Sequence, residues 1–128
     1  MIVRTLDEIR KTFRNHETPE WASRRFLLKE DGVGFSLSET IINKGTEGQI
    51  WYKHHIEACY CIAGEGEIEV LAPEPKIYQI RPGTVWALNK HDKHMLRVKK
   101  TMRLVAVFCP PITGHEEHDA DGSYPPSD

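Results

Sequence analysis

The regular spacing of turn-forming residues restricts the fold of this chain more than any other feature. From Trp21 onward, short apolar segments are separated by Gly, Pro, Asn and Asp at intervals of roughly ten residues. This pattern is typical of a barrel or sandwich, because a parallel βαβ sheet would need helical segments between the strands. It predicts an all-β fold of roughly nine to eleven strands. The candidate strands are residues 24–28, 34–42, 48–52, 58–63, 67–71, 76–80, 85–88, 94–98 and 102–109.

One short helix is expected before this region. Thr5 and Glu8 form the Ser/Thr-x-x-Glu pattern of a capping box, and Ile9 and Phe13 follow at helical spacing. Residues 1–4 are predicted to form a short strand. Residues 15–20 are polar and contain Thr-Pro, which predicts a loop.

Length and charge limit the classes of function. A chain of 128 residues has the size of one domain and can bury an apolar core without staples. Its 17 basic and 19 acidic residues give a formal charge of -2, which offers no basic field to nucleic acid or an anionic membrane. No apolar run approaches the roughly 18 residues of a membrane span, and no N-terminal segment has the apolar region of a secretory signal. We therefore expect a single cytoplasmic domain over residues 1–128 that acts on a small molecule.

The three cysteines are an odd number, which favours reduced thiols over a disulfide framework. Cys59 and Cys61 are two residues apart in a predicted strand and would face the same side. Buried apolar thiols are the favoured interpretation, and a structural zinc site that also uses Cys109 is the weaker alternative.

Two groups of histidines are candidates for metal binding. The first is the run His54-His55-Ile56-Glu57, where a histidine and a carboxylate lie close together on a predicted barrel wall. Iron, zinc and manganese all accept such donors. Solvated histidines at a strand edge are an equally good interpretation of this run alone. In the second group, His91 lies among polar loop residues, whereas His94 begins an apolar run and is the better ligand candidate.

The C-terminal segment, residues 110–128, allows two interpretations. Its prolines, glycines and acidic residues favour a disordered tail by composition. Alternatively, Glu116 and His118, which follow the rigid pair Pro110-Pro111, belong to a lid that folds over a barrel mouth. A lid over residues 110–118 is the structure that we predict, despite the composition. Disorder is expected beyond Tyr124 in either case.

Two motifs resemble those of the cupin superfamily. The spacing of Glu57 and Gly64 is similar to the first cupin motif, and Pro82-Gly83 followed by Trp86 is similar to the second, with tryptophan where most cupins keep a histidine ligand. The resemblance narrows to the ectoine synthases through short sequence segments, called phrases here, that occur in order along nearly the whole chain. These phrases are Met1-Ile2-Val3-Arg4, Trp21-Ala22-Ser23, Gly34-Phe35-Ser36, Gly64-Glu65-Gly66-Glu67-Ile68-Glu69, Lys90-His91-Asp92-Lys93-His94, Val107-Phe108, Pro110-Pro111-Ile112-Thr113-Gly114 and His118-Asp119.

This resemblance implies a single-domain, jelly-roll-like cupin barrel that forms a homodimer and binds one Fe(II), with zinc or manganese as alternatives. Glu57 and His94 match two of the family's three metal ligands. The third, a tyrosine in the family, is Trp86 here. An indole nitrogen is a donor only and has no lone pair for a metal. Trp86 is therefore expected to face the cavity among the substrate-contacting residues.

The implied reaction is that of a hydro-lyase in compatible-solute biosynthesis under osmotic stress. The α-amine of N-γ-acetyl-L-2,4-diaminobutyrate attacks the acetyl amide carbon, and water leaves to give ectoine. A metal would polarise the amide oxygen, and Glu116 is the expected base, oriented by His118. The resemblance also implies roles for six further residues. Tyr52 is expected to take part in catalysis. The other five are expected to bind the substrate: Trp21, Arg25, Thr40, Trp86 and Phe108.

Two alternatives to this function stay open. Ser38 and Ala106, like Trp86, depart from the family's usual residues and would reshape the pocket. The first alternative is therefore a diverged cupin enzyme that acts on a related amino acid. The second is a metal-free cupin that only binds a small molecule.

Overall fold

The computed structural model describes residues 1–127, and antiparallel strands make up most of this part of the chain. The 8-stranded sheet has the order β1-β2-β3-β8-β5-β6, with β4 paired to β8 and β7 paired to β5. The all-β prediction with one short N-terminal helix is thus confirmed. The elements are α1 (Leu6–Arg10), β1 (Asn15–Glu17), β2 (Trp21–Leu27), the 3₁₀ turn η1 (Lys29–Asp31), β3 (Ser36–Ile42), β4 (Glu47–Ile50), β5 (Ile56–Val70), β6 (Lys76–Ile80), β7 (Val85–Ala87) and β8 (His94–Cys109).

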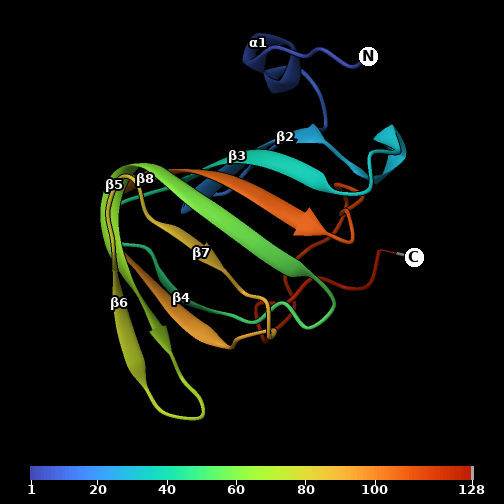
Figure 1. The fold of residues 1–128 in the computed structure, drawn as a ribbon. Coiled ribbons are helices and arrows are strands. Elements are labelled where there is room, and N and C mark those ends of the chain that lie inside the picture. The colour runs from blue at the N-terminus through green and yellow to red at the C-terminus, as the bar shows by residue number, and fades with distance from the viewer. Residues whose placement is uncertain (128) are drawn as a thin grey trace.

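Two long strands fold this sheet into a barrel. β5 has 15 residues and β8 has 16, and each passes from one wall of the barrel into the other (Figure 1). The sequence pattern predicted two strands in each of these regions. That division was wrong, because the register between β5 and β8 shifts between Cys61 and Gly66 without either strand leaving the sheet.

Two glycines make this bend sterically possible. Gly64 has φ +93°, and a Cβ there would lie 2.3 Å from the Thr101 carbonyl oxygen. A Cβ at Gly66 would lie 2.3 Å from the Arg97 carbonyl oxygen. The run Gly64-Glu65-Gly66 is therefore the fold-over point of one continuous strand.

The N-terminal helix has the predicted cap. The Glu8 amide donates to Thr5 Oγ1 at 3.3 Å, and the Thr5 amide donates to Glu8 Oε2 at 3.1 Å. Residues 1–4 do not form the predicted strand, and β1 lies inside the predicted loop at residues 15–20, paired with β2. This short polar edge strand lacks the apolar alternation by which strands are recognised in a sequence.

Residues 110–127 pack against the open end of the barrel. They follow β8 without regular structure and pass beside the barrel's mouth (Figure 1). Ile112 and Tyr124 join an apolar group with Leu28, Tyr52, Leu88 and Phe108, while a larger group fills the rest of the barrel. Ser127 is buried too, against the expectation of disorder beyond Tyr124, and its hydroxyl lies 2.8 Å from His55 Nε2. No helix within residues 1–127 has the length and apolarity to cross a membrane.

Candidate active site

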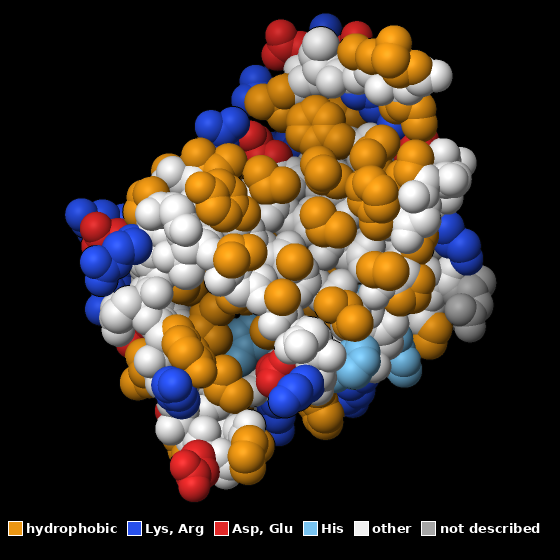
Figure 2. Space-filling view, viewed as in Figure 1, with side chains coloured by type: hydrophobic (Ala, Val, Ile, Leu, Met, Phe, Trp, Pro, Cys, Tyr) orange, Lys and Arg blue, Asp and Glu red, His pale blue; other side chains and the backbone are white. Residues whose placement is uncertain are grey.

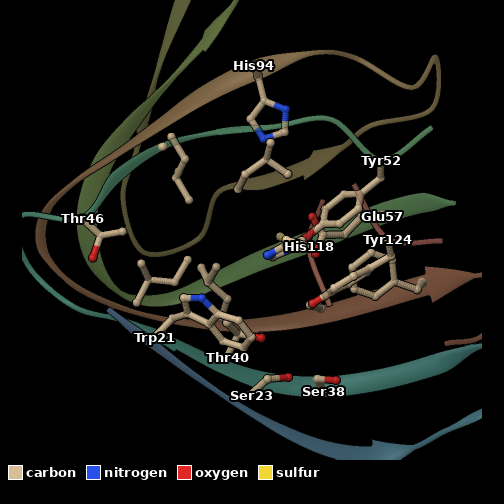
Figure 3. A pocket seen from close by; sticks show the side chains of 18 of the residues that line it. Trp21, Ser23, Ser38, Thr40, Thr46, Tyr52, Glu57, His94, His118 and Tyr124 are labelled. Carbon is tan, nitrogen blue, oxygen red and sulfur yellow. The ribbon is translucent and has the colours of Figure 1, made fainter. Parts of the chain in front are cut away.

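A cavity of about 270 Å³ lies inside the barrel, between the two walls and the C-terminal segment. Most of the residues singled out in the sequence line this one cavity, although they lie far apart along the chain (Figure 3). They are Trp21, Thr40, Tyr52, Glu57, Trp86, His94, Phe108 and His118. The volume suits a molecule of amino-acid size, and the apolar and aromatic wall with a few polar groups is typical of small-molecule sites.

Glu57 places a carboxyl group in this largely apolar wall. Strand alternation directs Glu57 and Cys59 of β5 to the same side, and both line the cavity. Burial raises the pKa of Glu57 to about 7, and a hydrogen bond with Cys59 only partly opposes this shift. The carboxylate has no cationic partner among the ion pairs of residues 1–127. A bound cation would therefore favour its charged form.

His94 is held with one ring nitrogen free for the cavity. Its Nδ1 lies 3.0 Å from the Asp92 carbonyl oxygen, which can only accept a hydrogen bond. Nδ1 therefore carries the proton, and Nε2 keeps its lone pair. Burial lowers the pKa of His94, which favours the neutral ring. Metal-binding histidines are commonly oriented by such a bond from the other nitrogen.

Glu57 and His94 suit a divalent metal ion by the chemistry of their donors. A third protein ligand of the usual kind is missing, because no group of three or more His, Cys, Asp and Glu side chains in residues 1–127 is arranged to hold a metal. Trp86 lines the same cavity, in register with Cys59, but cannot coordinate. Glu57 and His94 are therefore the side chains of this cavity that would hold such an ion.

Tyr52 and His118 form a polar pair in the same cavity. The Tyr52 hydroxyl lies 2.8 Å from His118 Nε2. Burial lowers the pKa of His118, and the positive charge of Arg25 lowers it further. Burial also raises the pKa of Tyr52 well above its usual value, with the Glu57 charge as the next cause. The pair therefore consists of a neutral imidazole and a protonated phenol, in which the phenol is able to donate to the ring nitrogen.

Arg25 and Glu116 are not part of the cavity wall. Arg25 is 1% exposed, and its Nη1 donates to the Gly114 carbonyl oxygen at 2.8 Å. Glu116 borders a second, adjoining opening, where its carboxylate accepts bonds from the Thr113 and Gly114 amides and the Ser127 hydroxyl. Partial burial acts to raise the pKa of Glu116, but these hydrogen bonds outweigh it and lower the pKa. A carboxylate stabilised in this way is a weak base. The hydrogen bonds of Arg25 and Glu116 hold the C-terminal segment in place.

Several lining residues were not found by the sequence patterns. Tyr124 is the largest of them, and its ring stacks on that of His118 with centroids 4.4 Å apart. Ser23 and Gln49 also line the cavity, as do Ser38 and Ala106, which had been noted only as departures. No local pattern distinguishes Tyr124 in its Gly- and Pro-rich surroundings, because its role depends on how the segment returns to the barrel.

Comparisons with known proteins point to one family. The sequence profile of the family described as ectoine synthase matches residues 1–128. The L-ectoine synthase of Desulfatibacillum aliphaticivorans is 58% identical over 127 residues, which cover 98% of this chain and 97% of that protein.

Solved structures give the same result. The crystal structure of ectoine synthase from P. lautus is 55% identical, with a TM-score of 0.84 over 89% of this chain and 81% of that one. The cupin domain of Schizosaccharomyces pombe Cnp3 has a TM-score of 0.61 over 75% of this chain and 67% of that one, at 15% identity. The latter likeness concerns the fold alone: the barrel resembles that of a cupin domain.

Proposed function

The chain belongs to the ectoine synthase family, and we propose that its barrel cavity closes N-γ-acetyl-L-2,4-diaminobutyrate into ectoine with the help of a divalent metal ion. The convergence of eight residues from separate parts of the chain on one cavity carries this proposal, together with a family match along the whole chain. As a lyase of this family, the protein makes a cyclic amidine by loss of water.

The aromatic and hydroxyl groups of the wall suit the substrate's shape. The Trp21 and Phe108 rings can pack on its methylene chain and acetyl methyl group, while Thr40 and Ser38 offer hydroxyls to its polar end. Enclosure of a flexible chain in a small cavity favours the folded conformer in which the amine meets the acetyl carbon. It also excludes bulk water, which suits a dehydration.

Tyr52 and His118 form a path for the proton that the reaction must move. The α-ammonium loses a proton to the Tyr52 oxygen as the phenol proton passes to His118 Nε2, over the 2.8 Å bond between them. The freed amine attacks the acetyl carbon to give a tetrahedral adduct. Return of the proton to the adduct's hydroxyl lets water leave and the C=N bond form. This assigns the base role to His118 in place of Glu116.

The metal is proposed at Glu57 and His94. When bound, it would supply Lewis acidity to the acetyl oxygen. Fe(II) is the proposed ion, because a carboxylate and an imidazole with open positions suit it, and zinc or manganese are the alternatives. With only two ligands from the chain, binding is expected to be weak enough to depend on the free metal concentration.

We also propose that the protein acts in the cytoplasm as a homodimer. Exposed apolar side chains on β5 and β7 support the dimer: Tyr60 and Val85 are register partners, 49% and 66% exposed, and Ile62 is 41% exposed. Figure 2 shows hydrophobic side chains gathered across the face where β3, β8 and β5 lie side by side in Figure 1. A contiguous apolar face of this kind is typical of a protein interface.

The test is ectoine formation from the acetylated substrate by the metal-stripped protein, with and without added Fe(II). Turnover that appears with the metal supports the proposal. Glu57→Gln and His94→Gln should each reduce metal content and lose most of the turnover, whereas Ile77→Ser on the outer surface should behave as wild type. Substrate binding without product at any metal concentration would overturn the proposal in favour of a binding protein.

A further inference from the structure

We propose that Tyr124 is a positioning residue that holds His118 and Tyr52 in the geometry for proton transfer. The inference rests on the proposed function and adds to it a residue from the C-terminal segment. Figure 3 shows Tyr124 beside Tyr52 and His118 in the cavity.

The Tyr124 ring is in contact with both members of the pair. It stacks on the His118 ring with an angle of 7° between the planes, at 4.4 Å between centroids. It also lies 5.2 Å from the Tyr52 ring and 5.7 Å from the Phe108 ring. A stacked ring leaves His118 little freedom to rotate, so its Nε2 stays directed at the Tyr52 hydroxyl.

A tight turn joins His118 to Tyr124 and produces the stack. Asp119 Oδ1 accepts from the Ser123 amide at 3.1 Å, and the Asp119 amide donates to the Ser123 carbonyl oxygen at 2.9 Å. The turn is attached to the barrel, because the Lys53 amide donates to Ser123 Oγ and the Trp51 amide donates to the Gly122 carbonyl oxygen. The position of Tyr124 is therefore set by the barrel wall.

Gly122 shows how close this attachment is. Its φ is +74°, and a Cβ there would lie 2.3 Å from the Gln49 carbonyl oxygen. Only glycine allows the turn to approach the end of β4 this closely.

Arg25 acts on Tyr124 and also on the start of the C-terminal segment. Burial raises the pKa of Tyr124, while the positive charge of Arg25 and a hydrogen bond from it act in the opposite direction. Arg25 also binds the Gly114 carbonyl oxygen at the other end of the segment. The guanidinium thus holds the start of residues 114–124 against β2, and its charge acts on Tyr124 at their end.

The Tyr124 ring also determines how much water reaches His118. Arg25 and His16 face His118 from β2 and β1 and lower its pKa, whereas Asp119 raises it. Trp21 and Tyr52 cover other sides of the ring. Removal of the Tyr124 ring would hydrate the imidazole, and relief of desolvation would raise the pKa of His118. The acid limb of the pH profile of kcat would then move to higher pH, because the base is protonated at a higher pH.

The experiment compares Tyr124→Phe and Tyr124→Leu with the metal-loaded wild type, with Tyr78→Leu on the outer face of β6 as the matched control. Tyr124→Leu should lower kcat by about tenfold or more, a part of the roughly 10²- to 10⁴-fold that acid–base catalysis contributes. Its acid limb should move to higher pH, with a smaller change in KM. Tyr124→Phe keeps the stack and should keep the position of the acid limb.

Each outcome decides the question. A Tyr124→Leu enzyme with the wild-type kcat and acid limb would overturn the inference, as would a Tyr124→Phe enzyme whose limb moves as far as that of the leucine variant. If Tyr124→Leu does not fold, Tyr124→Met is measured by the same criteria. A wild type that makes no ectoine would instead refute the proposed function.

Discussion

At the scale of single residues, Trp86 is the most informative departure in the cavity. It occupies a wall position shared with Glu57 and His94, yet its indole offers no lone pair. It also packs against both apolar groups of the interior. The side chain therefore contributes packing at a place where a tyrosine oxygen would contribute a ligand.

The substitution Trp86→Tyr is expected to tighten Fe(II) binding by about tenfold, or about 1.4 kcal/mol, because a third protein ligand becomes available. Iron titration of the stripped protein measures this effect, with Trp86→Phe as the control that makes similar space without an oxygen. Equal or weaker iron binding by the tyrosine variant would show that position 86 does not face the metal.

At the scale of elements, sequence patterns predicted the strands well and their continuity badly. The spacing of turn residues located the wall segments of β5 and β8. Glu57 and His94 were accordingly placed at the start of strands, and they lie at the second residue of β5 and the first of β8. The bend at Gly64 escaped prediction, because a glycine pair reads as a turn unless the close approach of Thr101 is known.

The cavity residues on strands were predicted better than those that depend on the C-terminal segment. Trp21, Thr40 and Phe108 lie on strands, and the family resemblance located them. The surroundings of Arg25 and Glu116 were not predicted, because their hydrogen-bond partners Gly114, Thr113 and Ser127 lie in a segment whose path depends on tertiary packing. Composition alone predicted disorder there, since it takes no account of attachment to the barrel.

Removal of residues 110–128 tests the role of this segment. Truncation after Cys109 is expected to abolish turnover while the barrel keeps its β-sheet signal, because His118 and Tyr124 are lost but the β5–β8 core is not. Burial of Tyr52, Leu88 and Phe108 would decrease, so the melting temperature should fall. Circular dichroism and the ectoine assay measure the two effects, and a truncated protein with full turnover would move the proton path elsewhere in the barrel.

At the scale of the whole molecule, the outer sheet face predicts the oligomeric state. Replacement of Tyr60 or Ile62 by lysine should convert a dimer into a monomer, because a buried unpaired charge is costly at an interface. Light scattering after size-exclusion chromatography gives the mass. Ile77→Lys on β6 is the control and should leave the dimer intact, and a wild type that is monomeric at all concentrations would contradict the dimer proposal.

The passage of β5 and β8 through both walls of the barrel has a consequence for cooperativity. Backbone hydrogen bonds run along these two strands from Ile56 opposite Cys109 to Val70 opposite His94. Neither wall can open without disturbing the shared pair, so the barrel lacks a boundary at which part of it could unfold alone. The amides of the β5–β8 ladder should therefore exchange with solvent deuterium only through global unfolding, at one common free energy. Amides in residues 110–127 should exchange earlier, through local detachment from the barrel.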